Sequence, residues 1–181
     1  MTSDAPKPAA PVQIRRLSSG EIAAAAPSLA AVLLDCVAGG ASVNFMADFT
    51  YERAEAFWRG VADAARGDGR VLFVAEDEEG ILGTVQLVPV LIDNQPHRAE
   101  VAKMLVHSRA RRHGVGERLL RAAEEAGRDM GRTLLTLDTA TGEAGERLYD
   151  RLGWVRVGVI PGHALYPDGR VASTTFYYKQ L

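Results

Sequence analysis

The spacing of apolar and polar residues divides the chain into short strands and amphipathic helices. Apolar and polar residues alternate over Val12–Leu17, which predicts a first strand. The alanine-rich stretch Ile22–Val37 predicts a helix that begins near Ser18, with Pro27 as a candidate break or second start. Helical spacing of apolar residues resumes over Tyr51–Ala65 and predicts a second helix.

The middle of the chain carries three apolar runs separated by short polar turns. The runs are Val71–Ala75, Ile81–Leu91 and Ala99–His107. Their short spacing predicts an antiparallel meander. Gly83 lies inside the second run and predicts a bulge or bend there.

Helices and strands alternate in the last third of the chain. One helical face from Val115 to Met130 is apolar, and Gly131 follows as the predicted helix end. The remaining predictions are a strand at Thr133–Leu137, a helix at Glu143–Leu152, a strand at Trp154–Ile160, an exposed loop at Pro161–Arg170 that holds His163, and a strand at Thr174–Lys179. This order of elements predicts an α+β fold with a mixed sheet.

Length and composition predict one domain without a membrane span. The chain has 181 residues, of which 47% are hydrophobic and 24% charged, as in ordinary globular proteins. Residues 1–11 are rich in Pro and Ala and predict a disordered tail, and residues 12–181 are expected to form the single domain. No uninterrupted run of about 18 apolar residues occurs, so the cytoplasm is the expected compartment.

Charge and cysteine content exclude several classes of site. The formal net charge is -2, which argues against a nucleic-acid-binding protein. The single cysteine, Cys36, excludes an intrachain disulfide and a cysteine-rich zinc site. Cys36 lies in an apolar helical run and is expected to be buried and unreactive. No His-Glu-x-x-His spacing occurs, so no catalytic metal is expected.

A basic, glycine-containing turn at Arg111–Gly116 joins a predicted strand to the amphipathic helix Glu117–Met130. Glycine lets the backbone turn tightly, and the first N–H groups of a helix have no intrahelical acceptor. These groups lie at the positive end of the helix dipole, and arginine adds forked donors that suit phosphate oxygens. The turn is therefore predicted to bind a phosphate group.

Three phosphate-binding patterns compete for this turn. A Walker loop requires Lys followed by Ser or Thr after its second glycine, whereas Glu117 follows Gly116 here. A dinucleotide fingerprint requires a third glycine, which Leu119 replaces. The remaining pattern is Arg or Gln, two residues, Gly, one residue, and Gly or Ala. Arg111, Gly114 and Gly116 match it position by position.

The chain resembles the GNAT superfamily of N-acetyltransferases, in which this last pattern forms the pyrophosphate loop. A second signature of the superfamily, Leu-Tyr-x-x-x-Gly-Phe/Trp, is similar to Leu148–Trp154, and the two signatures occur in the order that the family shows. The resemblance covers residues 12–181 and implies a mostly antiparallel sheet flanked by helices. Gly158–Leu181, together with Leu137–Thr139, looks closest to the tabtoxin-resistance-like branch.

The resemblance implies acetyl-coenzyme A as co-substrate. Pantetheine would lie along a strand that splays from its parallel neighbour and leaves backbone groups unpaired. The pyrophosphate would rest on backbone N–H groups of the turn, assisted by the side chains of Arg111 and Arg112. The implied cofactor-binding residues are Met104, Leu105, Val106, Arg111, Arg112, His113, Gly114, Val115, Gly116 and Glu117.

The family's direct attack of a primary amine on the thioester implies further roles. A strand N–H near Val106 is the candidate donor to the carbonyl oxygen. Tyr149 matches the tyrosine of the second signature, and a phenol with a pKa near 10 can protonate the departing thiolate. Glu100 and Asp138, at the ends of strands that are expected to splay, are the two candidates to hold the ammonium and take its proton, directly or through water.

Three functions remain open. The leading hypothesis is an N-acetyltransferase that acts on a small-molecule amine, and the tabtoxin-resistance-like branch suggests an antimetabolite or antibiotic. The alternatives are a non-catalytic acyl-coenzyme A-binding regulator and a protein or peptide N-acetyltransferase. Tyr149 and the two carboxylates disfavour the regulator. No nucleic-acid or membrane partner is expected, and the protein is expected to be a monomer or homodimer.

Overall fold

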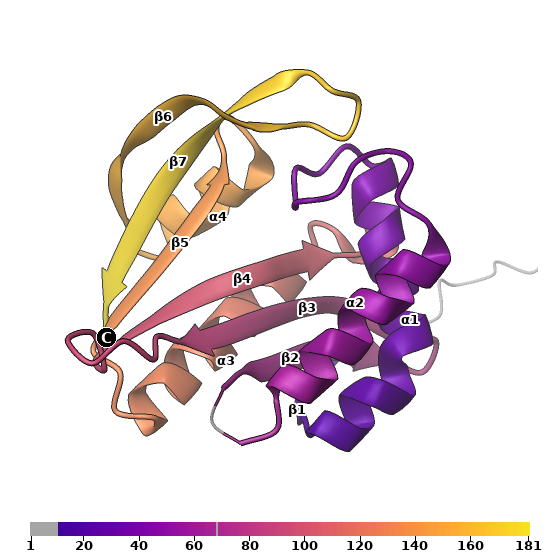
Figure 1. The fold of residues 1–181 in the computed structure, drawn as a ribbon, viewed down its shortest axis with the longest axis horizontal. Coiled ribbons are helices and arrows are strands. Elements are labelled where there is room, and N and C mark those ends of the chain that lie inside the picture. The colour runs from indigo at the N-terminus through magenta and orange to yellow at the C-terminus, as the bar shows by residue number, and fades with distance from the viewer. Residues whose placement is uncertain (1–10, 68) are drawn as a thin grey trace, which may run out of the picture.

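The chain folds around one seven-stranded sheet, shown in Figure 1 for the computed structural model. The structure describes residues 11–67 and 69–181. The strand order is β1-β2-β3-β4-β5-β7-β6, and among the described strands only the β4–β5 pair is parallel. The predicted fold class, an α+β fold with a mostly antiparallel mixed sheet between helices, is confirmed. Most of the predicted tail, residues 1–11, lies outside the described residues.

The elements follow the predicted order. The first six are β1 (Gln13–Leu17), α1 (Ser19–Ala38), α2 (Tyr51–Ala64), β2 (Val71–Asp77), β3 (Gly80–Pro89) and β4 (Arg98–Val106). The others are a short 3-10 helix η1 (Ser108–Ala110), α3 (Val115–Asp129), β5 (Leu134–Ala140), α4 (Ala144–Arg151), β6 (Val155–Leu165) and β7 (Val171–Gln180).

Helix α1 begins at a capping box and runs through Pro27 without a break. The Ser18 hydroxyl accepts from the Glu21 N–H, and the Glu21 carboxylate accepts from the Ser18 N–H at 2.8 Å. Proline removes one backbone hydrogen bond, but Ala26, Leu29 and Ala30 on the inner face are fully buried, so packing holds the helix together. The break considered at Pro27 is therefore absent.

Two apolar cores lie on opposite faces of the sheet. Helices α1 and α2 cover one face, where Leu29, Leu33 and Trp58 are buried. Helices α3 and α4 cover the other face and bury Leu119 and Tyr149. By length and composition α1 could cross a membrane, but its apolar residues are part of the first core. Cys36 is buried there, as predicted, and burial raises the pKa of its thiol.

The predicted meander and the bend at Gly83 are both confirmed. β2, β3 and β4 pair antiparallel in sequence order, and the β2–β3 register shifts next to Gly83. A Cβ atom at this position would lie 2.5 Å from the carbonyl oxygen of Leu105. Only glycine permits this close approach of β3 to β4.

Two predicted strand ends are wrong. β5 extends to Ala140, so Asp138 lies inside the strand and not at its end. β6 extends to Leu165, so half of the predicted Pro161–Arg170 loop is strand, and His163 stacks edge-on against Phe176. The β6–β7 register shifts between Ile160 and Ala164. Proline in the gap lacks the N–H that a regular ladder needs, and the hairpin absorbs it as a bulge.

A buried ion pair ties the last strand to the helices on the second face. Glu124 of α3 accepts from the Lys179 ammonium at 2.8 Å and from the Trp154 indole N–H at 3.0 Å. The side chains of Glu124 and Lys179 are only 5% and 18% exposed. Lys179 also donates to the Leu152 carbonyl, so both buried charges have hydrogen-bond partners.

Candidate active site

The parallel strands β4 and β5 separate after a short paired stretch. They pair only over Arg98–Glu100 against Leu134–Thr136. Beyond these residues β4 continues along β3 while β5 continues along β7, and Figure 1 shows the two strands diverging. The edge of β4 that faces β5 therefore has no strand partner from Val101 to Val106. The expected splay is present, and Met104, Leu105 and Val106 lie on the unpaired stretch.

The turn after β4 forms a cradle of free backbone N–H groups. Arg112 and Gly114 have φ values of +67° and +75°, and Gly114 is the N-cap of α3 without a side-chain cap. Within the described residues, the N–H groups from Arg112 to Glu117 donate to no acceptor. They stand at the positive end of a 15-residue helix. This arrangement can hold an anion of the size of a phosphate group.

Gly116 allows the start of α3 to approach both β4 and α4. A Cβ atom here would lie 3.0 Å from Met104 Cε and 3.2 Å from Leu148 Cδ2. Leu148 belongs to the second sequence signature, so the two signatures meet at this glycine. The first turn of α3 is thereby positioned beside the unpaired stretch of β4.

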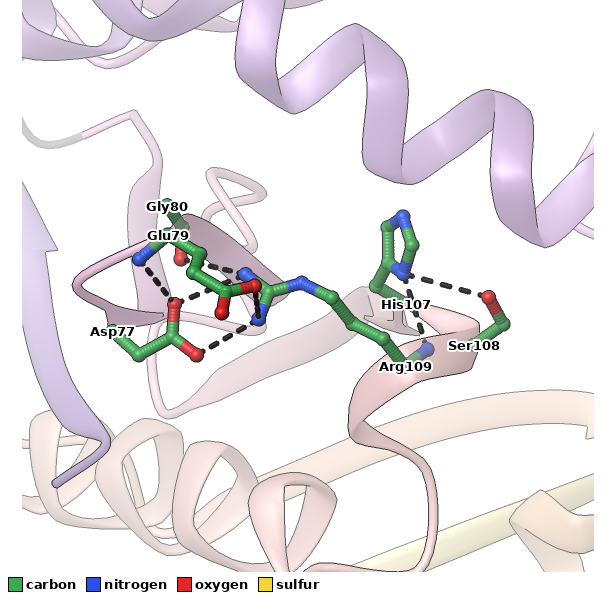
Figure 2. A network of polar contacts seen from close by, with 6 residues as sticks. All are labelled: Asp77, Glu79, Gly80, His107, Ser108 and Arg109. Carbon is green, nitrogen blue, oxygen red and sulfur yellow. Dashed lines mark hydrogen bonds and ion pairs between the residues drawn. The ribbon is translucent and has the colours of Figure 1, made fainter. Parts of the chain in front are cut away.

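Ion pairs and hydrogen bonds fix the start of the turn from two sides. On one side, Asp35 of α1 accepts from the Ser108 N–H and hydroxyl, each at 2.7 Å. On the other, the Arg109 guanidinium donates to both carboxylate oxygens of Asp77, at 2.8 and 3.0 Å (Figure 2). The Arg109 N–H donates to His107 Nδ1 at 3.2 Å. The cradle is therefore anchored to α1 and to the β2–β3 hairpin.

The two arginines of the turn differ in what they contact. The Arg111 Nε donates to the Val106 carbonyl at 3.2 Å, and its guanidinium lies 3.9 Å from Asp35 and close to Gly39. Its side chain thus joins β4 to the end of α1. Arg112 and His113 are exposed beside the cradle. The assignment of the Arg111 and Arg112 side chains to phosphate stays a prediction.

Tyr149 lies on α4 with a buried ring and an unpaired hydroxyl. Its ring packs 6.0 Å from Trp154 and 5.7 Å from Tyr177, and the residue is 5% exposed. Gly145 makes room for this packing, because a Cβ there would lie 3.3 Å from the Tyr149 ring. Within the described part of the chain the hydroxyl makes no hydrogen bond, and burial and the Asp138 charge raise its pKa. The phenol is therefore held in its protonated, donating form.

The two candidate carboxylates have different surroundings. Glu100 is exposed and forms an ion pair with Arg98 at 3.0 Å, at the point where the strands part. Asp138 lies two residues beyond Thr136, the last residue of β5 that pairs with β4, and is exposed. Its charge acts on both Tyr149 and Lys103. Of the two carboxylates, Asp138 and not Glu100 therefore lies near enough to Tyr149 for its charge to raise the pKa of the phenol.

Lys103 is a residue of this region that the sequence patterns did not single out. It lies in a bulge of β4 with φ +47°, and its Nζ is 5.8 Å from the ring centroids of Phe45 and Phe57. Burial lowers the pKa of its ammonium group. The sequence signal that could have identified Lys103 is the presence of a lysine inside the apolar run Val101–Val106.

Segments from both ends of the chain meet over this side of the sheet. The Ser42 hydroxyl donates to the Leu165 carbonyl at 2.8 Å, and the Ala47 N–H donates to the Pro167 carbonyl at 3.0 Å. The loop between α1 and α2 therefore contacts the β6–β7 hairpin. The loop also carries Phe45, which stacks on Phe49 at 4.0 Å and places aromatic rings near Lys103.

The sequence of this region matches a known family. Residues 67–156, which include the diverging strands, the cradle and Tyr149, match the acetyltransferase (GNAT) domain. The chain carries a GNAT acetyltransferase domain. The domain is 35% identical over 106 residues to an uncharacterized N-acetyltransferase of Azospirillum brasilense from the hisH-hisA intergenic region. That alignment covers 58% of this chain and 61% of the relative, so the chain matches less than two thirds of the relative's length.

Solved structures share the fold of this GNAT domain. A GNAT-family acetyltransferase from Streptococcus pneumoniae is 21% identical, with a TM-score of 0.76 over 94% of this chain and 100% of its own. The yncA protein of Salmonella typhimurium, solved with its cofactor acetyl-CoA, is 18% identical, with a TM-score of 0.74 over 94% of each chain. These likenesses confirm the GNAT fold.

Proposed function

We propose that the protein is an acetyl-coenzyme A-dependent N-acetyltransferase that acts on a primary amine of a small molecule. The observation that carries the proposal is the juxtaposition of a free N–H cradle, an unpaired strand edge and a protonated tyrosine. The GNAT domain and the acetyl-CoA in the related yncA structure support it. Four points stay predictions: a role in detoxification, membership of the tabtoxin-resistance-like branch, a location in the cytoplasm, and a monomeric or homodimeric state.

The residues present fit acetyl-coenzyme A in three places. The N–H groups from Arg112 to Glu117 lack acceptors and would hold the pyrophosphate. The unpaired edge of Met104–Val106 would receive the amides of pantetheine as a partial strand. Bound in this way, acetyl-coenzyme A supplies an acetyl thioester as the acyl donor, and the N–H near Val106 would stabilise charge on its carbonyl oxygen.

Tyr149 would act as the general acid. When the amine nitrogen bonds to the acetyl carbon and the carbon–sulfur bond breaks, the sulfur leaves with a negative charge. The Tyr149 hydroxyl has no competing acceptor among the described residues and can donate its proton to that sulfur. The raised pKa keeps the phenol protonated throughout the neutral range.

We infer that Asp138 holds the acceptor ammonium. An ammonium group needs a nearby negative charge and must lose a proton before it attacks. Glu100 already forms an ion pair with Arg98, whereas Asp138 forms no ion pair with a described residue, and its charge raises the pKa of Tyr149. Asp138, directly or through water, would take the proton.

The test is a thiol-release assay with acetyl-coenzyme A and a panel of amines, amino acids, aminoglycosides and peptides. Turnover with small amines and none with peptides is expected. Asp138→Asn should lower kcat/KM for the amine more than Glu100→Gln does, and the two variants serve as matched controls for each other. Equal losses in both would contradict the assignment of Asp138. Tight binding of acetyl-coenzyme A without turnover of any amine would favour the alternative, an acyl-coenzyme A-binding regulator.

A further inference from the structure

A group of hydrogen-bond donors without acceptors lies on the α1–α2 face of the sheet, next to the divergence of β4 and β5. Three of its members, Trp58, Arg70 and Gln86, each have a buried side-chain N–H without a partner within the described residues. Trp58 and Gln86 are completely buried. A buried donor without an acceptor is costly, so this group demands an explanation.

The group is connected to Lys103 through two side chains. The Arg70 guanidinium donates to Gln86 Oε1 at 2.9 Å, and its charge acts on the Lys103 ammonium. Phe57, next to Trp58 on α2, has its ring 5.8 Å from Lys103 Nζ. The Lys103 ammonium has no hydrogen bond or ion pair with a described residue, whereas the Lys103 backbone carbonyl accepts from the Thr84 hydroxyl at 2.8 Å. Two cations therefore stand together, and no described carboxylate pairs with either.

The two cations Lys103 and Arg70 have no carboxylate of the described residues paired with them. Glu100 is occupied by Arg98, so Asp138 is the other carboxylate at the strand divergence. Asp138 acts on Lys103 only at longer range, because no ion pair forms between them. A half-buried ammonium between aromatic rings is stabilised when a ligand brings a carboxylate to it.

The position of Lys103 relative to the reacting groups limits the ligand. The charge of the Asp138 carboxylate acts to raise the pKa of both Lys103 and Tyr149, so both side chains lie within electrostatic range of it. The bulge, with its left-handed φ at Lys103, sets this side chain within the stretch of β4 that diverges from β5. A strained backbone conformation of this kind is typical of functional sites.

We propose that the Lys103 ammonium, backed by the Arg70 guanidinium, binds the anionic group of the acceptor, so that the acceptor is a small amine that also carries a carboxylate. This inference rests on the proposed acetyl transfer and names its substrate class. The amine would lie at Asp138 and the carboxylate at Lys103, with the apolar part of the acceptor against Phe45 and Phe57.

The experiment compares acceptors that differ only in the anionic group. Each amino acid of a panel is assayed beside its amide and its decarboxylated amine. The wild-type protein should prefer the carboxylates, and Lys103→Met should raise their KM by about 10- to 100-fold, the loss of a hydrogen bond between charged groups. The KM for the amides should stay within about twofold, and Lys103→Arg should recover part of the preference.

Arg53→Met is the matched control, because Arg53 also lies over an aromatic ring, 5.2 Å from the Phe49 centroid, but is exposed. It should leave both acceptor classes unchanged. Thermal unfolding and the variant Lys103→Gln guard against a folding defect. Equal wild-type rates for carboxylates and amides would overturn the inference while acetyl transfer stands. A fall in kcat for both classes in Lys103→Met would also overturn it, since Lys103 would then act on the reacting amine. If no amine of the panel supported thiol release, the proposed function itself would be refuted.

Discussion

Replacement of Tyr149 by Phe separates the proposed proton donor from the packing of its ring. The ring lies between Trp154 and Tyr177 and would remain in place. The hydroxyl makes no hydrogen bond to a described residue, so its loss should change the free energy of unfolding by less than about 1 kcal/mol. A general acid contributes about 10²- to 10⁴-fold to a rate, so kcat should fall by at least about 100-fold.

Tyr177→Phe is the matched control in the same aromatic cluster. The Tyr177 hydroxyl donates to the Asp150 carboxylate at 3.1 Å, and the residue is 1% exposed. Its removal should cost about 1.5–3 kcal/mol of stability, the range for a hydrogen bond to a charged group, and leave kcat unchanged. Each substitution removes one phenolic hydroxyl. Tyr149→Phe should lower kcat and spare stability, whereas Tyr177→Phe should lower stability and spare kcat.

Steady-state thiol release measures kcat and KM for both variants, and urea unfolding measures their stability. The KM for acetyl-coenzyme A should be similar in all three proteins, because neither hydroxyl lies in the cradle. Since the pKa of Tyr149 is raised, ionisation of its phenol should produce no fall in rate between pH 7 and about pH 9. An unchanged kcat in Tyr149→Phe, or an equal loss in Tyr177→Phe, would refute the assignment.

Two further predictions concern stability. Glu124→Gln leaves the Lys179 ammonium buried with a neutral partner and should destabilise the protein by about 3 kcal/mol, the lower end for a broken buried pair; a loss below about 1 kcal/mol in urea unfolding would mean that the pair is solvated. Hydrogen bonds from Ser18 lower the pKa of Glu21 to about 2 from 4.5. Its contribution should thus be complete above pH 4.5 and disappear as the pH falls toward 2, and the Tm difference between wild type and Glu21→Gln should vanish over that range.

Local patterns in the sequence predicted the elements well. The helix start near Ser18, the bend at Gly83 and the helix after Gly114 depend on residues close in sequence, and all three occur. Pro27 and the β6 segment after Ile160 were harder to interpret. In both cases tertiary packing or pairing with β7 overrides a proline that interrupts the local pattern.

The candidate site was predictable only in part, because some of its features depend on residues that are distant in the sequence. The cradle follows from a contiguous motif, because its N–H groups belong to one turn and one helix. The difference between Glu100 and Asp138 depends on Arg98 and on where two strands part, which no spacing reveals. Lys103 becomes conspicuous only when Phe57 and Arg70, distant in sequence, are placed beside it.

Thermal unfolding with and without acetyl-coenzyme A tests the central claim most directly. At about 100 times its Kd, a ligand that binds only the folded protein stabilises it by about 2.7 kcal/mol. For a chain of this length that gain corresponds to a rise in Tm of about 5–10 °C. Acetyl-coenzyme A should produce this rise, whereas ATP and NAD at the same concentration should not. The absence of a rise with acetyl-coenzyme A, or an equal rise with ATP or NAD, would contradict a coenzyme A cradle at Arg112–Glu117.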